Sequence, residues 1–125
     1  MILDTNALSA WAEGDPACRE PFLSAERIVV PVVVLGEYLF GIRQSRFRQR
    51  YEAWLSLHLP SAELYPVTPK AAGMYADARL WLKAKGTPIP SNDLWIAATA
   101  LERDMPVLSK DAHFDLVPGV RRISF

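Results

Sequence analysis

The chain begins with Met1-Ile2-Leu3-Asp4-Thr5-Asn6, a short apolar run that turns polar at Asp4. This pattern predicts a buried β-strand that leads directly into a helix. Similar runs at residues 27–30, 105–108 and 120–125, and a weaker one at residues 64–67, predict further strands.

Segments with helical periodicity separate these predicted strands. Apolar residues within 32–44 repeat at the i, i+4, i+8 spacing of one helical stripe. Residues 46–58 are a second such segment, with Phe47 on its predicted inward side. We expect Asn6 or Asp15 to cap the helical segments that follow the first strand.

Two more helices are predicted in the second half of the chain. One begins at Pro69 and ends at Gly86, with Trp81 on its apolar side. The other is capped by Ser91 and runs to about Arg103. Strands that alternate with helices indicate an α/β sandwich with a mainly parallel sheet, although the path of the Pro69 helix relative to that sheet stays open.

Length and composition fit a single domain over residues 1–125. Half of the residues are hydrophobic, and the formal net charge is zero. The longest apolar run, residues 28–35, is too short to cross a bilayer, and no basic leader precedes Asp4. The only cysteine, Cys18, fits an inert thiol in a reducing compartment. We therefore expect a soluble cytoplasmic protein without membrane contact.

Positive charge is concentrated in one short segment. Such a segment can hold phosphates, or it can be an ordinary solvated helix face, and both interpretations stay open. Its arginines lie beside Phe47 and Tyr51, and they are Arg43, Arg46, Arg48 and Arg50. We keep Arg43 as a candidate substrate contact.

Four acids can be placed at one edge of the predicted sheet. Asp4 ends the first strand, and Glu37 lies early in the helix that follows the second strand. Asp93 lies in the first turn of a helix that ends just before strand 105–108, and Asp111 follows that strand. In open α/β sheets, ligands bind beyond the carboxyl ends of the strands. The four acids are therefore expected to share a pocket.

Each acid alone also has a structural explanation. The negative charge of Asp93 would interact favourably with the dipole at the start of its helix. Glu37 could be half exposed, and Asp111 or Asp115 could cap a loop. The functional interpretation comes from the four acids taken together. Their polar neighbours can orient them or bind metal-held water, and these are Thr5, Asn6, Asn92 and Ser109.

Electrostatic repulsion connects these acids to a metal ion. Two carboxylates about 4 Å apart repel each other by roughly 4 kcal/mol at an effective dielectric near 20. No Lys or Arg is expected among them, so a bound divalent cation would offset the repulsion between the carboxylates. Oxygen ligands without a His or Cys cluster suit Mg²⁺ or Mn²⁺. Such a site can activate water and stabilise the leaving oxygen in phosphodiester hydrolysis.

Four blocks of the sequence resemble PIN-domain proteins, in particular the VapC-like toxin ribonucleases of bacterial toxin–antitoxin pairs. They occur in the order and spacing of that family over nearly the whole chain. The blocks are Ile2-Leu3-Asp4-Thr5-Asn6, Val34-Leu35-Gly36-Glu37-Tyr38-Leu39-Phe40-Gly41-Ile42, Pro90-Ser91-Asn92-Asp93-Leu94-Trp95-Ile96-Ala97-Ala98 and Leu108-Ser109-Lys110-Asp111-Ala112-His113-Phe114.

The resemblance implies a three-layer α/β/α PIN-like domain. It also implies Mg²⁺- or Mn²⁺-dependent endonucleolytic cleavage of RNA, inhibition by a cognate antitoxin, and a homodimer. On this mapping Asp4 and Asp93 are the strongest candidates for metal ligands, and Glu37 acts on metal or on a bound water. Asp111 is the fourth acid, with Asp115 as its alternative.

Other functions were weighed against this one. A PIN-like fold that binds RNA or protein without cutting would not need all four acids, whereas a DNA-directed nuclease would use the same acids. A dehalogenase-type phosphatase needs a second acid at the place of Asn6, and a receiver domain needs paired acids at the first strand. His58 is interpreted as a helix-end residue, and His113 as structural or adjacent to phosphate.

Overall fold

A computed structural model describes residues 1–125. Its centre is a five-stranded sheet in the order β3-β2-β1-β4-β5, and every neighbouring pair is parallel. The strands are β1 (Ile2–Leu3), β2 (Val29–Pro31), β3 (Glu63–Tyr65), β4 (Val107–Leu108) and β5 (Arg122–Ile123). The predicted α/β class is thus confirmed, and the sheet is entirely rather than mainly parallel.

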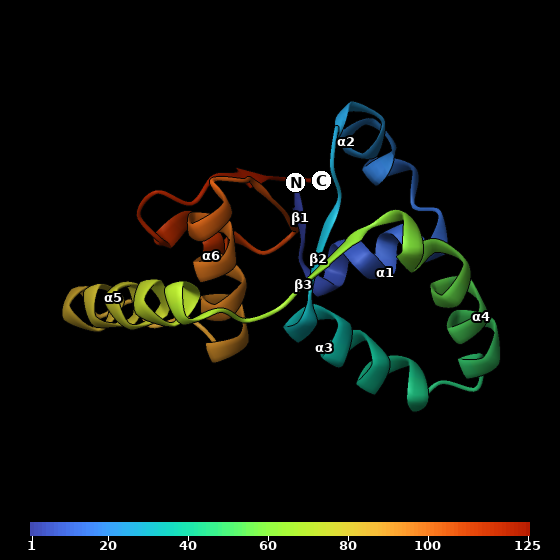
Figure 1. The fold of residues 1–125 in the computed structure, drawn as a ribbon, viewed down its shortest axis with the longest axis horizontal. Helices are drawn as coiled ribbons and strands as arrows, with labels where there is room; N and C mark the ends of the chain where they lie inside the picture. The colour runs from blue at the N-terminus through green and yellow to red at the C-terminus, as the bar shows by residue number, and fades with distance from the viewer.

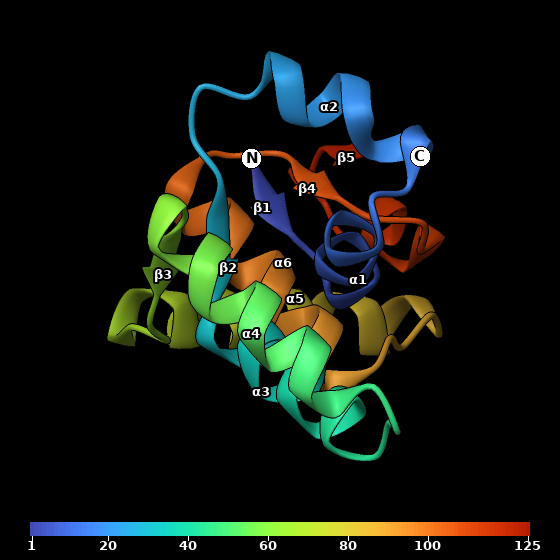
Figure 2. The same cartoon turned by 90° about the vertical axis from the view of Figure 1, so that its right-hand side faces the viewer.

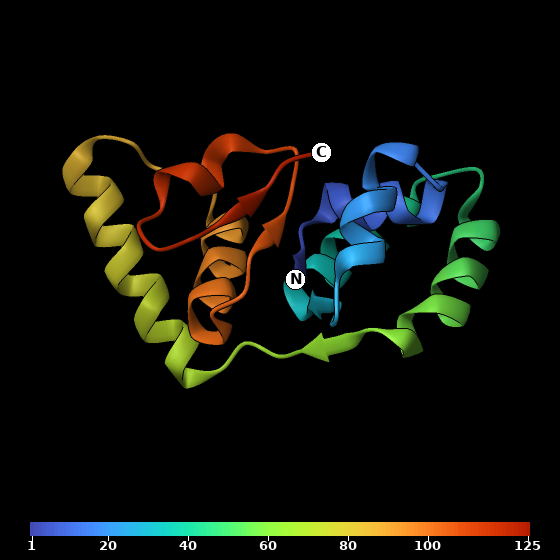
Figure 3. The same cartoon turned by 90° about the horizontal axis from the view of Figure 1, so that it is seen from above.

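Helices cover both faces of this sheet, which makes three layers. Figure 1 shows α5 and α6 on one side of the strands and α1, α2 and α4 on the other, and Figure 3 shows the same separation from above. The helices are α1 (Thr5–Glu13), α2 (Arg19–Ser24), α3 (Val32–Arg43), α4 (Arg48–His58), α5 (Pro69–Lys85) and α6 (Ser91–Arg103). Short 3₁₀ turns are η1 (Pro16–Cys18), η2 (Leu59–Ser61) and η3 (Ala112–Leu116).

The strand order places a topological switch point beside β1. From β1 the chain moves outward to β2 and β3, and it returns to the other side of β1 for β4 and β5. Loops that leave β1 and β4 therefore diverge and open a crevice at the carboxyl edge, where open α/β sheets bind ligands. Figure 2 shows β1, β2 and β4 side by side beneath α2.

The two central strands form the middle of the core. Ile2, Leu3, Val107 and Leu108 are completely buried, and Ile2 lies opposite Val107 in the register of β1 and β4. Apolar residues on successive positions are expected for strands buried on both faces. The backbone N–H of Asp4 donates to the carbonyl of Leu108 at 3.2 Å, which extends this pairing one residue beyond β1.

Three local predictions were wrong, and a fourth, that Asn6 or Asp15 caps a helical segment after β1, is confirmed for Asp15. Asp15 caps η1 by accepting from the backbone N–H of Ala17 at 2.9 Å, whereas Asn6 lies inside α1, which Asp4 caps by accepting from the backbone N–H of Thr5. Ser91 is the first residue of α6 rather than its cap, and its hydroxyl pairs with that of Tyr75. Phe47 and Trp81, both expected to face inward, are 47% and 42% exposed.

Helix α5 packs on α6 rather than on the sheet. The ring of Tyr75 stacks on that of Trp95 with centroids 4.0 Å apart, and Ala78 and Leu82 are buried in the same contact region. As predicted, α5 begins at Pro69 and is closed by Gly86 in the left-handed conformation. None of the helices is long and apolar enough to cross a membrane.

Candidate active site

The crevice at the carboxyl ends of β1 and β4 holds an open cavity of about 1000 Å³. Its wall is polar apart from two hydrophobic side chains, and it contains no Lys or Arg. The lining residues come from α1, α3, α6 and the loop after β4, and they are Asp4, Thr5, Asn6, Ser9, Val33, Gly36, Glu37, Phe40, Asn92, Asp93 and Asp111. All four predicted acids thus lie in one cavity.

Asp4 lies at the base of this cavity and is 5% exposed. Its Oδ2 accepts hydrogen bonds from the Ser109 hydroxyl at 2.6 Å and from the Asn6 amide at 2.7 Å, while Oδ1 accepts from the Thr5 backbone at 2.7 Å. Burial raises the pKa of Asp4 despite these bonds, and the nearby charges of Asp93 and Glu37 raise it further. The site therefore disfavours the negative charge of Asp4 when no cation is bound.

Glu37 faces the cavity from the second turn of α3. Both of its carboxylate oxygens are engaged, because the Thr5 hydroxyl donates to Oε2 and the Asn92 amide donates to Oε1. Since Thr5 belongs to α1 and Asn92 to α6, three helices meet at this one carboxylate. This arrangement fixes the orientation of Glu37 before any ligand arrives.

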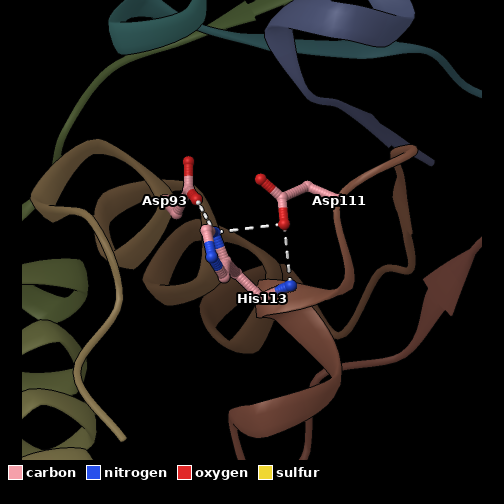
Figure 4. Close-up of side chains that lie close together, drawn as sticks. All are labelled: Asp93, Asp111 and His113. Carbon is pink, nitrogen blue, oxygen red and sulfur yellow. Dashed lines mark hydrogen bonds and ion pairs between the residues drawn. The ribbon is translucent and has the colours of Figure 1, made fainter.

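Asp93 and Asp111 are joined by His113 (Figure 4). Its Nδ1 lies 3.0 Å from Oδ2 of Asp93 and 3.1 Å from Oδ1 of Asp111. Burial raises the pKa of Asp93, although the hydrogen bond from His113 opposes that shift. The two carboxylates in turn raise the pKa of His113, which favours the imidazolium form. One ring nitrogen thus partly balances two acids.

The sequence interpretation underestimated His113. It was expected to be structural or adjacent to phosphate, but it contacts two of the acids directly. The signal for this role was its place two residues after Asp111, within a 3₁₀ turn that Asp111 caps by accepting from the His113 backbone N–H at 2.9 Å. A turn of this kind brings the ring back over the acid that caps it.

Two other candidate positions lie outside the cavity wall. Asp115, the alternative to Asp111, forms a two-pronged ion pair with Arg122 at 2.9 and 2.7 Å. Arg43 lies at the end of α3, where its Nε is 4.0 Å from Glu52. The geometry therefore favours Asp111 over Asp115, and it gives Arg43 no contact with the acids.

The remaining titratable candidates have structural surroundings. The Nδ1 of His58 lies 2.8 Å from the carbonyl of Trp54, and the two rings stack with centroids 4.5 Å apart. Cys18 is buried, and burial raises the pKa of its thiol, which lowers its reactivity. Neither residue lines the cavity.

The donor set fits a hard divalent cation. Four carboxylates line the cavity, two of the acids have a raised pKa, and no Lys or Arg lines the wall, so His113 is the only basic side chain beside them. The tightest group of ligand atoms comes from Asp93, Asp111 and His113, whose atoms lie within 4.8 Å of one another. Such oxygen-rich sites suit Mg²⁺ and Mn²⁺, and Mn²⁺ also accepts an imidazole nitrogen.

The chain is similar to one family of known proteins over nearly its whole length. The model of the PIN domain family matches residues 1–120. Ribonuclease VapC5 of Mycobacterium tuberculosis is 31% identical over 124 residues, which are 98% of this chain and 90% of the relative.

Two solved structures extend the comparison. The VapBC-5 toxin–antitoxin structure from M. tuberculosis contains a chain with 32% identity and a TM-score of 0.79, over 99% of this chain and 97% of that one. DNA-bound VapBC from Salmonella typhimurium contains a chain with 27% identity and a TM-score of 0.88, over 98% of this chain and 96% of that one.

Proposed function

The chain belongs to the PIN-domain family, and on that premise we propose that it is a Mg²⁺- or Mn²⁺-dependent endoribonuclease and the toxin of a toxin–antitoxin pair. The observation that carries the proposal is the gathering of Asp4, Glu37, Asp93 and Asp111 around one open cavity that no Lys or Arg lines. A relative named as a ribonuclease, 31% identical over almost the whole chain, supports RNA as the substrate.

Asp4, Asp93 and Asp111 would hold the ion, with Glu37 facing it or a water beside it. A bound divalent ion would supply a Lewis acid for a phosphate oxygen and lower the pKa of a water. Ser109 and Asn6 hold Asp4 in position, and Thr5 and Asn92 hold Glu37. These fixed carboxylates need little rearrangement during the reaction, which is how preorganised groups lower a barrier.

Glu37 is the residue best placed to accept a proton. It is half-buried and lines the cavity from α3, whereas Asp4 is deeply buried. Both Glu37 oxygens already accept a hydrogen bond, and a carboxylate oxygen has a second lone pair for a water. We therefore assign the orientation of the attacking water, and the removal of its proton, to Glu37.

A cognate antitoxin is the proposed protein partner. The similar solved chains come from VapBC toxin–antitoxin structures, including one bound to DNA. We also propose that the protein is a homodimer and acts in the cytoplasm. The exposed arginines of the α3–α4 region would bind RNA phosphates. A DNA-directed nuclease would use the same acids, so the assay below includes both nucleic acids.

Cleavage of a labelled RNA and its DNA counterpart tests the proposal. Wild type is expected to cut the RNA only with Mg²⁺ or Mn²⁺. The cleavage rate of Asp93→Asn is expected to be lower by a factor of more than about 100, because this substitution removes a charged group that would stabilise the transition state. The matched control is Asp77→Asn, an exposed acid on α5. Cleavage that survives a chelator, or that is insensitive to Asp93→Asn, would contradict the proposal.

The same variant separates catalysis from folding. Asp93 has a raised pKa in the folded chain, so its negative charge costs free energy of folding at neutral pH. Asp93→Asn should therefore leave the metal-free melting temperature unchanged or higher. A loss of several kcal/mol of stability would instead identify Asp93 as a structural acid.

A further inference from the structure

One wall of the cavity combines an exposed aromatic ring with bare helix surface. Val33, Gly36, Glu37 and Phe40 lie at the i, i+3, i+4, i+7 positions of α3, and all four line the cavity. Phe40 is 71% exposed, although it is one of only two hydrophobic residues in the lining. Phe40 is therefore an apolar surface that a ligand in this polar cavity can contact.

We propose that Phe40 and the bare helix surface at Gly36 form a platform on which the RNA base next to the scissile phosphate stacks. This inference rests on the proposed function. Aromatic side chains are the usual stacking partners of unpaired bases, and the base face is the main apolar surface that RNA offers. Phe40 is the only aromatic residue that lines the cavity.

Gly36 leaves the space that this platform needs. Side chains on a helix lean toward its N-terminus, so the Phe40 side chain is directed toward the turn that contains Gly36. A Cβ built on Gly36 meets no atom within 4 Å, so the helix surface there is open. A planar group can approach the helix at this position without displacing another side chain.

The proposed platform lies one helical turn from an acid of the cavity on α3. Glu37, Phe40 and Arg43 follow one another at three-residue steps, each about 4.5 Å along the helix axis. They offer, in turn, an acid of the reaction centre, an aromatic ring and a cation. The Arg43 side chain is 57% exposed, and its Nε lies 4.0 Å from Glu52. Glu37 and Phe40 share one face of α3 and therefore suit a reacting phosphate and its neighbouring base, whereas Arg43 lies farther around the helix and outside the cavity wall.

The test compares Phe40→Leu with Phe40→Tyr on a short single-stranded RNA. Leucine keeps the apolar character but removes the ring, and tyrosine keeps the ring. Phe40→Leu is expected to weaken RNA affinity and raise KM roughly 5- to 150-fold, which is the range for loss of one stacked base. Phe40→Tyr should restore both within about threefold. The control is Trp81→Leu, which removes an exposed aromatic ring from α5 without touching the cavity.

A second pair of variants fills the open space instead of removing the ring. Gly36→Leu places a side chain where the base would lie, and Gly73→Leu makes the same change on α5, where a Cβ also meets nothing within 4 Å. Leucine has the higher helix propensity, so neither variant is expected to unfold the chain. Of the two variants, only Gly36→Leu should raise KM. Mn²⁺ should still raise the melting temperature of Gly36→Leu, because the metal-binding acids are unchanged.

The outcomes separate the platform from the proposed function. Wild type that cleaves RNA, with Phe40→Leu showing unchanged affinity and KM, overturns the platform and leaves the nuclease intact. A Phe40→Leu variant that changes only the oligomeric state or binding of a protein partner also overturns it. Wild type that neither binds nor cleaves RNA with either metal overturns the nuclease, and the platform with it.

Discussion

At the scale of single residues, the electrostatics of the metal-free site depend on the contacts of His113 with Asp93 and Asp111. The ring stands between Asp93 and Asp111 at 3.0 and 3.1 Å, while the other two acids have uncharged donors only. His113 is thus the one basic side chain in contact with the acids, and their carboxylates raise its pKa. Its position explains how two carboxylates can lie close together before an ion binds.

This arrangement predicts a pH-dependent contribution of His113 to stability. Asp93 and Asp111 raise its pKa above the ordinary 6.5, so the folded chain binds its proton more tightly than the unfolded chain. The stabilisation is fully present below about pH 6.5 and is lost as the pH rises through the raised pKa. In chelator, His113→Gln should therefore melt lower than wild type near pH 5.5, with a smaller difference near pH 9. A difference that does not change with pH would contradict this role.

The positions of the acids could be predicted because each adjoins a recognisable element boundary. Asp4 and Asp111 follow apolar strands, and Asp93 begins a helix, so parallel topology brings them to one edge. The contact of His113 with Asp111 had a local signal, but its contact with Asp93 could not be predicted, because it joins residues 20 positions apart. The catalytic roles of these residues stay predictions.

At the scale of elements, α5 is tied to the rest of the molecule through its first turn. The Thr68 hydroxyl accepts from the Ala71 backbone N–H at 3.0 Å and so caps the helix. It also donates to Oε1 of Glu102 on α6 at 2.7 Å. Oε2 of Glu102 is buried without a partner, so Thr68 is the only side-chain donor to this carboxylate.

Thr68→Ala should therefore cost more than an ordinary cap. Loss of an N-cap costs about 0.5–2 kcal/mol, and a buried acceptor left unpaired adds about 1–3 kcal/mol. We expect a total of about 1.5–5 kcal/mol from urea unfolding, and near-complete recovery in Thr68→Ser, which keeps the hydroxyl. Equal losses in both variants would show that the methyl group, rather than the hydroxyl, matters.

The elements themselves were mostly predictable, but their surroundings were not. The period of residues 32–44 and the Pro69 and Gly86 signals place α3 and α5 within a residue or two. Phe47 and Trp81 were wrongly expected to be buried. The local periodicity of a helix shows which of its faces is apolar, but it does not show how much of that face a neighbouring element covers. Here α5 packs mainly on α6, so part of its apolar stripe, including Trp81, faces solvent.

At the scale of the whole molecule, the acids link metal binding to the stability of the fold. They reach the cavity from α1, α3, α6 and the loop after β4, so a bound ion would connect segments that are far apart in the sequence. Because the unfolded chain does not hold these groups together, an ion that binds only the folded form stabilises it by mass action.

Millimolar Mg²⁺ or Mn²⁺ should consequently raise the melting temperature of wild type. A concentration a hundred times the dissociation constant gives about 2.7 kcal/mol, which corresponds to several degrees for a domain of this size. Protons compete for the same groups, because Asp4, Asp93 and His113 all have a raised pKa. The shift should therefore grow as the pH rises from about 5 to about 8, opposite in sign to the His113 contribution in chelator. Calorimetry with Asp93→Asn as the control measures this directly. An equal shift in that variant would place the ion elsewhere, and no shift in wild type would remove the basis for a metal site.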